Sequence, residues 1–237
     1  MKSLPGNFKD VRLFASSDCN ALAQAVPAAL NTGIQILVGI WTKDANHYNA
    51  EKQALLNAVA KYGVSWISAI SVGSEDLYRG DTDPNTLAQQ IYDVRGMMSV
   101  SGGKGIWVGH TDTWNLWSND TAGVVIAACD FVGMNAYSYF QYHQPNSIDN
   151  AVALFDADIA ATASFIAKYR PGTHIWLTET GWPVAGPTTG QAVASIANAE
   201  RWWQEVCHIP CTYGVILYLL CRVGALTGQI TPATSTR

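Results

Sequence analysis

Short apolar runs recur along the chain at intervals of roughly 30 residues, and amphipathic stretches separate them. Most of these runs are apolar at successive positions rather than alternating, which is typical of strands buried on both faces of a parallel sheet. We therefore expect strands at Val11–Phe14, Gln35–Trp41, Trp66–Val72, Gly105–Gly109, Phe131–Asn135, His174–Thr178 and Tyr213–Leu219.

The intervening stretches carry helix signals. Asp83 is a candidate N-cap with Pro84 at the first helical position, and Ser147 is expected to cap a longer helix that ends before Pro171-Gly172. Further helices are expected over Asn20–Thr32, which contains Pro27, over Ala50–Tyr62, which ends at Gly63, and over Gln191–Val206.

Alternation of strands and helices with short connections predicts an α/β fold with a parallel sheet. Carboxylates at the C-terminal ends of strands favour a TIM (β/α)8-type barrel, of which about seven strands are recognisable. A doubly wound open sheet is the alternative, but GGKG at 102–105 lies between a helix and a strand, the wrong context for a phosphate loop. We expect one barrel domain over residues 1–226 and an unstructured tail over 227–237.

The amino-acid composition narrows the classes of ligand and partner that the protein is expected to bind. Apolar residues make up 49% of the chain, charged residues 14%, and the net charge is −4. No basic run is present, which argues against nucleic acid or an anionic membrane as a partner. The late apolar run Gly214–Leu220 is too short to span a bilayer, and Met1–Asp10 lacks the apolar core of a signal peptide. Nine Trp and ten Tyr are many for this length; we expect most of them in the core, and an exposed surplus is suited to binding a neutral ligand such as a sugar.

Cysteine and histidine usage gives no metal or cofactor signature. There are five Cys and five His, and neither a paired CxxC nor a nucleophile elbow is present. Cys207 and Cys211 are close enough for a bridge, although spacing alone does not establish one. We expect no metal and no cofactor, with the histidines in ordinary packing or solvent. Asn119-Asp120-Thr121 is a glycosylation sequon.

Two of the buried strand signals end in a glutamate. Glu75 follows Trp66–Val72 after Gly73-Ser74, and Glu179 ends the run that begins at His174 and precedes Gly181-Trp182-Pro183. Each alone is readily explained as a strand-end acid in a salt bridge. Together they are what glycoside hydrolysis needs: one carboxyl as acid and base, the other as nucleophile.

The segments around these glutamates carry a family resemblance. VGSEDLYRG at 72–80 and TETGWP at 178–183 are similar to the two signature motifs of glycoside hydrolase family 17, the β-1,3-glucanases. VRLFASSDCN at 11–20, GHTDTW at 109–114 and MNAYSYFQ at 134–141 resemble its fungal cell-wall branch. The resemblance extends from about residue 8 to about residue 218.

The resemblance implies roles for individual residues. Glu75 resembles the acid/base and Glu179 the nucleophile, and Tyr137 is expected to hydrogen-bond the nucleophile. Asp112 and Trp114 are expected to contact substrate. Three further assignments come from the same motifs: Trp182 as a stacking platform with a core position as the alternative, Ser74 as a sugar-binding residue where relatives often carry Asn, and Asp76 as an acid that points away from the site.

The implied activity is retaining hydrolysis of β-1,3-glucan at internal bonds, in fungal cell-wall metabolism. Transglycosylation by the same chemistry and a catalytically impaired glucan-binding wall protein are the alternatives. We expect a monomeric, extracellular or cell-wall glycoprotein. Compared with the family, the sequence also lacks a recognisable strand before Val11 and changes character after Leu220, so we expect a barrel shortened at both ends.

Overall fold

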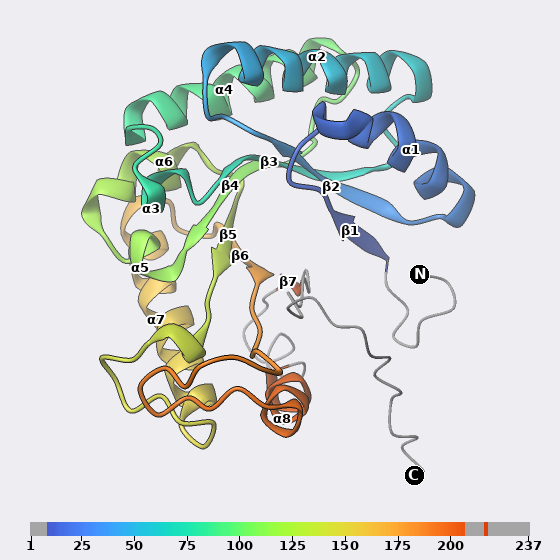
Figure 1. Ribbon diagram of the computed structural model, residues 1–237. Helices are drawn as coiled ribbons and strands as arrows, with labels where there is room; N and C mark the ends of the chain where they lie inside the picture. The colour runs from blue at the N-terminus through green and yellow to red at the C-terminus, as the bar shows by residue number, and fades with distance from the viewer. Residues whose placement is uncertain (1–8, 207–215, 218–237) are drawn as a thin grey trace.

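The computed structural model describes residues 9–206 and the short strand at 216–217. Seven parallel strands form one sheet in the order of the sequence, β1-β2-β3-β4-β5-β6-β7. The sheet curves strongly, so that it forms an open barrel with helices on its outer side (Figure 1). The strands are β1 Asp10–Arg12, β2 Gln35–Ile40, β3 Ile67–Ser74, β4 Val108–Thr113, β5 Phe131–Asn135, β6 His174–Glu179 and β7 Ile216–Leu217.

Helices connect successive strands. The longer ones are α1 Ala21–Thr32, α2 Ala45–Tyr62, α4 Pro84–Val100, α6 Gly123–Ala128, α7 Ala151–Tyr169 and α8 Ile196–Val206. Short helices follow the strand ends at α3 Asp76–Arg79, α5 Trp114–Trp117, η1 Asp18–Asn20, η2 Asp120–Ala122 and η3 Ser138–Phe140. None of the described helices is long and apolar enough to cross a membrane.

Both faces of the sheet are apolar, for two different reasons. The outer face packs on the helices, where Val38 and Ile70 of the sheet join Leu55 and Ile91 of the helices in one buried cluster. The inner face holds a smaller cluster of Leu37, Ala69, Phe131 and Trp176, with the rings of Phe131 and Trp176 stacked at 4.1 Å between centroids. The two clusters account for strands that are apolar at successive positions.

The structure confirms the predicted α/β class and an incomplete barrel of seven recognisable strands. Several boundaries differ from expectation. β4 lies three to four residues later than predicted, α2 begins at Ala45 because Asp44 caps it, and α7 begins at Ala151 rather than near Ser147. α8 starts at Ile196 rather than Gln191. The predictions for residues 1–8 and 227–237 and for Cys207, Cys211 and Cys221 lie outside the described residues.

Candidate active site

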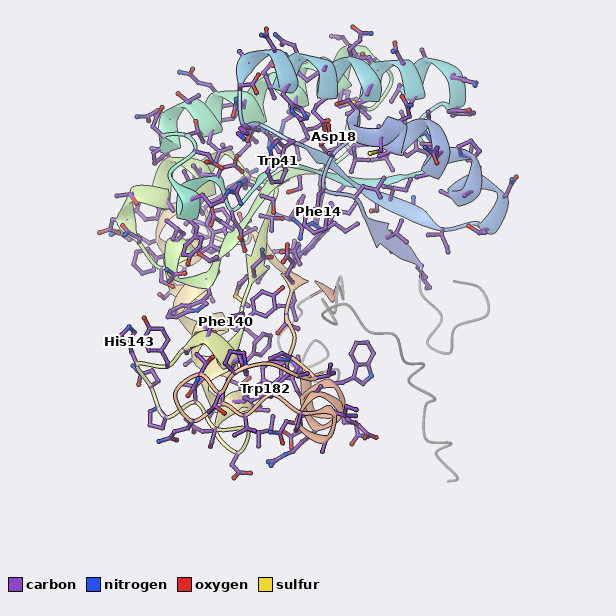
Figure 2. All side chains as sticks on the ribbon, viewed as in Figure 1. Phe14, Asp18, Trp41, Phe140, His143 and Trp182 are labelled. Atoms are coloured by element: carbon purple, nitrogen blue, oxygen red, sulfur yellow. The ribbon has the colours of Figure 1, made fainter. Side chains whose placement is uncertain are left out.

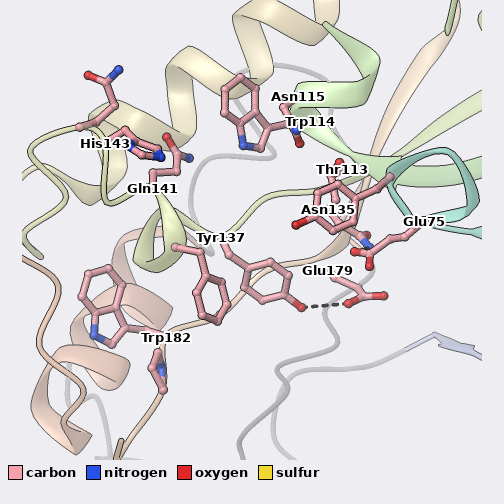
Figure 3. A pocket seen from close by; sticks show the side chains of 15 residues that line it. Glu75, Thr113, Trp114, Asn115, Asn135, Tyr137, Gln141, His143, Glu179 and Trp182 are labelled. Atoms are coloured by element: carbon pink, nitrogen blue, oxygen red, sulfur yellow. Dashed lines mark hydrogen bonds between the residues drawn. The ribbon is translucent and has the colours of Figure 1, made fainter. Parts of the chain in front are cut away.

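A cleft of about 1030 Å³ lies at the C-terminal ends of β3 to β6 (Figure 3). In a parallel barrel this is the end where functional side chains gather, because the strand-to-helix loops meet there. The cleft is lined by two acids and by aromatic and amide side chains: Glu75, Tyr78, Thr113, Trp114, Asn115, Asn135, Tyr137, Phe140, Gln141, His143, Gln144, Glu179, Gly181, Trp182 and Pro183.

Glu179 ends β6, and donors hold both of its carboxylate oxygens. The Arg12 guanidinium donates to Oε1 at 2.9 Å, and the Tyr137 hydroxyl donates to Oε2 at 2.9 Å. The Glu179 side chain is only 10% exposed. A charged donor on one oxygen and a hydroxyl on the other stabilise the ionised carboxylate and fix its orientation. The Tyr137 hydroxyl therefore lies where the resemblance led us to expect it.

Sequence reasoning missed Arg12. This residue of β1 is buried, and its second amino group donates to Oγ of Ser74 at 3.0 Å. Its guanidinium also lies 4.4 Å from the centroid of the Phe14 ring. Burial lowers the pKa of Arg12, an effect that the adjacent carboxylate of Glu179 opposes. In a three-residue strand at the sheet edge, an Arg is easily mistaken for a solvent-exposed charge. The available signal was its place between Val11 and Leu13 in the fungal motif.

Glu75 follows β3 and has a looser environment than Glu179. Its Oε1 accepts a hydrogen bond from the Asn135 amide at 2.8 Å, and Oε2 lies 3.9 Å from Arg79. The side chain is 26% exposed. The Asn135 carbonyl in turn accepts from Thr178 Oγ1 at 2.7 Å, so Asn135 links Glu75 to the strand that carries Glu179. Both carboxylates face the same cleft (Figure 3).

A tight turn between β3 and α3 aims Glu75 into the cleft. Glu75 adopts a left-handed conformation with φ 58°, and Gly73 has φ 75°. Asp76 folds back under this turn, where its carboxylate accepts from the Ser74 backbone at 2.6 Å and from the Thr42 hydroxyl. Asp76 is buried, in agreement with the expectation that it points away from the site. Non-glycine residues with positive φ are uncommon and concentrate at functional sites.

Asp112 does not line the cleft, in contrast to our expectation of a substrate contact. Its side chain is fully buried, because its oxygens accept from the backbone N–H groups of Leu77 at 3.0 Å and Thr113 at 2.7 Å. His110 Nε2 lies 3.1 Å from the same carboxylate. Burial alone would lower the pKa of His110, but Asp112 and Asp76 raise it above its ordinary value. Asp112 therefore supports the first turn of α3, directly behind Glu75.

The other residues predicted to contact sugar differ in how far their side chains are buried. Trp114 is half-buried and lines the cleft. Trp182 contributes to the cleft wall but is only 4% exposed, because its ring packs against Tyr139 and Trp202 and its indole N–H donates to the Val193 carbonyl. This placement corresponds to the core alternative rather than the stacking platform. Ser74 is buried beneath Arg12 rather than open to the cleft.

Aromatic side chains that sequence reasoning did not select provide most of the exposed ring surface. Tyr78 is 57% exposed and Phe140 is 61% exposed, and both line the cleft. Phe140 lies above the ring of Trp182 in the lower half of the molecule (Figure 2). Both residues sit on short helices after strand ends, where single-sequence patterns cannot distinguish exposed rings from buried ones.

A curved parallel sheet with two glutamates facing one cleft at its C-terminal edge is the architecture of the barrel glycoside hydrolases. Comparison with known proteins narrows this class. The BtgE/BtgC glycoside hydrolase domain family matches residues 1–220, so the chain belongs to this family, within glycoside hydrolase family 17.

Two relatives illustrate the relationship. The chain is 38% identical to a glucan 1,3-beta-glucosidase of Schizosaccharomyces pombe over 84% of its own length and 63% of the relative. It is 41% identical to a probable glucan endo-1,3-beta-glucosidase eglC of Aspergillus terreus, covering 85% of the chain and 44% of the relative. The chain thus spans between about two fifths and two thirds of the length of the curated relatives it matches.

A solved structure is also similar. It is the glycoside hydrolase family 17 beta-1,3-glucanosyltransferase from Rhizomucor miehei, with a TM-score of 0.79 and 31% identity over 90% of this chain and 75% of that one. An active-site mutant of the same enzyme was solved in complex with laminaritriose and has a TM-score of 0.78.

Proposed function

We propose that this protein cleaves β-1,3-glucan with retention of configuration, with Glu179 as nucleophile and Glu75 as acid/base. The observation that carries the proposal is the contrast between the two carboxylates. Glu179 is held on both oxygens by Arg12 and Tyr137, whereas Glu75 has one amide donor, a more distant Arg79 and partial exposure. A fixed, ionised group suits attack on carbon, and a partly exposed one suits proton exchange with substrate and water.

The reaction proceeds in two steps. Glu179 attacks the anomeric carbon while Glu75 protonates the departing glycosidic oxygen, which gives a glycosyl-enzyme ester and releases the rest of the chain with a free hydroxyl at its new non-reducing end. Glu75, now a carboxylate, takes a proton from water, and this water displaces Glu179 from the anomeric carbon. No cofactor is required, because Glu75 supplies and then removes the proton and Glu179 supplies the electron pair of the ester bond.

A β-1,3-glucan is the substrate that the family favours, and the cleft is suited to it. A neutral polymer offers no charge to bind, and the exposed rings of Tyr78 and Phe140 offer apolar faces to sugar rings. Amide side chains of Asn115, Gln141 and Gln144 line the same cleft and are suited to hydrogen bonds with hydroxyl groups. The relatives named endo-1,3-beta-glucosidases support cleavage at internal bonds.

Transglycosylation is the second candidate, and one observation favours it. The similar Rhizomucor miehei structure is a beta-1,3-glucanosyltransferase. In that case a sugar hydroxyl replaces water in the second step, and every other role is unchanged. Chromatography of the products from laminari-oligosaccharides separates the candidates: shorter products alone indicate hydrolysis, whereas products longer than the substrate indicate transfer. Binding without products would leave only a glucan-binding role.

The nucleophile assignment has a direct test. A fluorinated glucoside with a good leaving group should form a stable ester on Glu179 of the unaltered protein, located by mass spectrometry of peptides. Glu179→Gln should abolish the label, whereas Glu200→Gln, at an exposed glutamate on α8, should retain it. A label on any other residue would remove Glu179 from this role.

The acid/base assignment predicts a dependence on the leaving group. Glu75→Ala should lose activity on natural glucans by a factor of about 10²–10⁴, the usual contribution of general acid catalysis. The first step with a dinitrophenyl glucoside should be largely spared, because this leaving group needs no proton. Azide should then restore turnover, because it replaces deprotonated water. Equal losses on both substrates would contradict the assignment.

We further propose that the protein acts as a monomer on cell-wall glucan outside the cell and carries a glycan at Asn119. Asn119 and Thr121 are both exposed, and the Asn119 side chain accepts a hydrogen bond from Thr121 Oγ1 at 3.1 Å. Treatment with an endoglycosidase should lower the mass of protein secreted from a fungal host. Asn119→Gln should remove this shift.

A further inference from the structure

A second group of titratable side chains lies on the loops after β1 and β2, outside the cleft. It consists of Asp18 in η1 and of His47 and Glu51 on the first two turns of α2. Nε2 of His47 lies 3.1 Å from Oδ1 of Asp18 and 3.3 Å from Oε1 of Glu51. The three potential ligand atoms all lie within 4.8 Å of one another.

The charge of this group is not balanced by the described residues around it. The Glu51 side chain is fully buried, and its oxygens accept from the backbone N–H groups of Ser16 at 2.5 Å, Ser17 at 2.8 Å and Trp41 at 3.2 Å and from the Ser17 hydroxyl. These neutral donors orient the carboxylate but bring no positive charge. Within residues 9–206, no Lys or Arg forms an ion pair with Glu51 or Asp18, which leaves His47 as their shared partner. Buried carboxylates are normally paired with a charge or bound to a metal ion.

The position of the His47 nitrogen is a second, independent observation. Nε2 is buried, and although two carboxylate oxygens lie close to it, neither is placed along its N–H direction for a hydrogen bond. When the imidazole of His47 is neutral with its proton on Nδ1, the lone pair of Nε2 points in this same direction. Zinc bonds to nitrogen and oxygen of about 2.0–2.1 Å place neighbouring ligand atoms of a tetrahedral shell roughly 3.3 Å apart. The two N···O distances here are close to that spacing.

We propose that Asp18, His47 and Glu51 bind a divalent transition-metal ion, with Zn²⁺ as the best fit to one imidazole and two carboxylates. The fourth ligand is water, because the Asp18 side chain is 59% exposed and leaves the site open on that side. With a neutral His47, the two carboxylates carry two negative charges and the ion neutralises them. The ion joins η1 to α2 and, through the hydrogen bond from the Trp41 backbone N–H to Glu51, to the loop after β2.

The site has a structural rather than a catalytic place in the molecule. The Arg79 guanidinium lies 5.1 Å from the centroid of the Trp41 ring. The same guanidinium lies 3.9 Å from Oε2 of Glu75. Figure 2 shows Asp18 and Trp41 in the upper half, away from Phe140 and Trp182. None of the three ligands contacts the cleft.

The test uses the 237-residue protein after removal of metal with a chelator. At a free Zn²⁺ concentration about 100 times its Kd, the melting temperature should rise by about 5–10 °C, and calorimetry should give one ion per chain. Asp18→Asn and His47→Ala should each abolish the rise. The matched control is His174→Ala, an exposed histidine at the start of β6, which should retain it.

Two outcomes would overturn the proposal. One is the absence of a zinc-dependent rise in the unaltered protein. The other is a rise that survives both substitutions, which would place the ion elsewhere. If His47→Ala does not fold, Asp18→Asn decides, because among the described contacts the exposed Asp18 carboxylate pairs only with His47.

Discussion

At the scale of single residues, the two glutamates differ by what surrounds them rather than by their own chemistry. Glu179 is nearly buried. The Arg12 guanidinium donates to one of its carboxylate oxygens, and the Tyr137 hydroxyl donates to the other. Glu75 projects from a turn and keeps a quarter of its side chain in solvent. This asymmetry is the basis on which we propose Glu179 as the nucleophile and Glu75 as the proton carrier.

The phenol of Tyr137 offers the mildest probe of this arrangement. Tyr137→Phe removes the donor to Glu179 Oε2 and leaves Arg12 in place. A hydrogen bond to a charged group contributes about 1.5–3 kcal/mol, so kcat should fall by roughly 10- to 150-fold and the melting temperature by about 3–12 °C. Tyr92→Phe, at a tyrosine 55% exposed on α4, is the control and should change neither quantity. An unchanged kcat in Tyr137→Phe would show that Arg12 alone orients Glu179.

The buried carboxyl group of Asp158 on α7 should make the stability of the protein depend on pH. Burial raises its pKa from 3.8 to about 7, and its hydrogen bond from Gln141, at 2.7 Å, opposes this only in part. Since the folded protein holds the proton more tightly than the unfolded chain, the resulting stability is present below pH 4. It is lost as the pH rises to about 7.

Asp158→Asn should remove this dependence. The amide is neutral at every pH and keeps an oxygen for Gln141, so the variant should be about 2–4 kcal/mol more stable than the parent at pH 8 and similar to it at pH 3.5. Urea unfolding across this range measures the difference. Asp149→Asn, at an exposed acid paired with Arg201, is the control and should follow the parent. Parallel curves for Asp158→Asn and the parent would contradict the prediction.

At the scale of elements, the junction of β3 and α3 positions Glu75, the proposed acid/base. Two buried carboxylates fix this junction from below, because Asp76 accepts from Ser74 and Asp112 accepts from Leu77. A Cβ at Gly73 would lie 2.1 Å from Oδ2 of Asp76, in a backbone conformation that L-residues avoid. The sequence VGSED is therefore a steric requirement as much as a chemical one.

Gly73→Ala tests this requirement. The variant should lose about 1–3 kcal/mol through its left-handed conformation, plus the displacement of Asp76, and activity should fall with Glu75 misplaced. Gly80→Ala is the matched control at the other end of α3, with φ 69° but no atom within 4 Å of the added carbon. It should lose about 1 kcal/mol and keep its activity. Equal activity losses in the two variants would show that the contact with Asp76 is unimportant.

The same elements show what the sequence alone could predict. The strands that pack on helices were found because their apolar runs are continuous. β4 was placed too early because its second half is polar, although His110, Thr111 and Asp112 are all buried. Polar residues at a buried strand end indicate a site, but in one sequence they are indistinguishable from a loop.

The candidate site was predicted unevenly for a related reason. Glu75, Glu179 and Tyr137 stand in recognisable motifs at strand ends, and the structure places all three on the cleft. Asp112 and Trp182 stand in similar motifs but are buried, because their partners, Leu77 and Val193, are brought to them only by the fold. Arg12 and Asn135 were missed because each acts on an acid at least 60 residues away.

At the scale of the whole molecule, a buried side chain spans the concave side of the sheet. β1 pairs with β2 at one end of the described order, and β6 lies near the other end. Arg12 of β1 nevertheless donates to Glu179 at the end of β6 and to Ser74 at the end of β3. The interior of the open barrel is thus held together by an ion pair between residues 167 positions apart in the sequence.

This ion pair predicts strong coupling between distant strands. Arg12→Met leaves the Glu179 carboxylate buried beside an apolar chain, which should cost about 3–5 kcal/mol of stability. The double variant Arg12→Met/Glu179→Gln removes both charges and should recover a substantial part of that loss, because burying a neutral amide is less unfavourable than burying an unpaired carboxylate. Urea unfolding of the parent, both single variants and the double variant gives the coupling energy directly. If the losses of the single variants simply add, the two strands are held by the backbone sheet alone, and the pair serves only to orient Glu179.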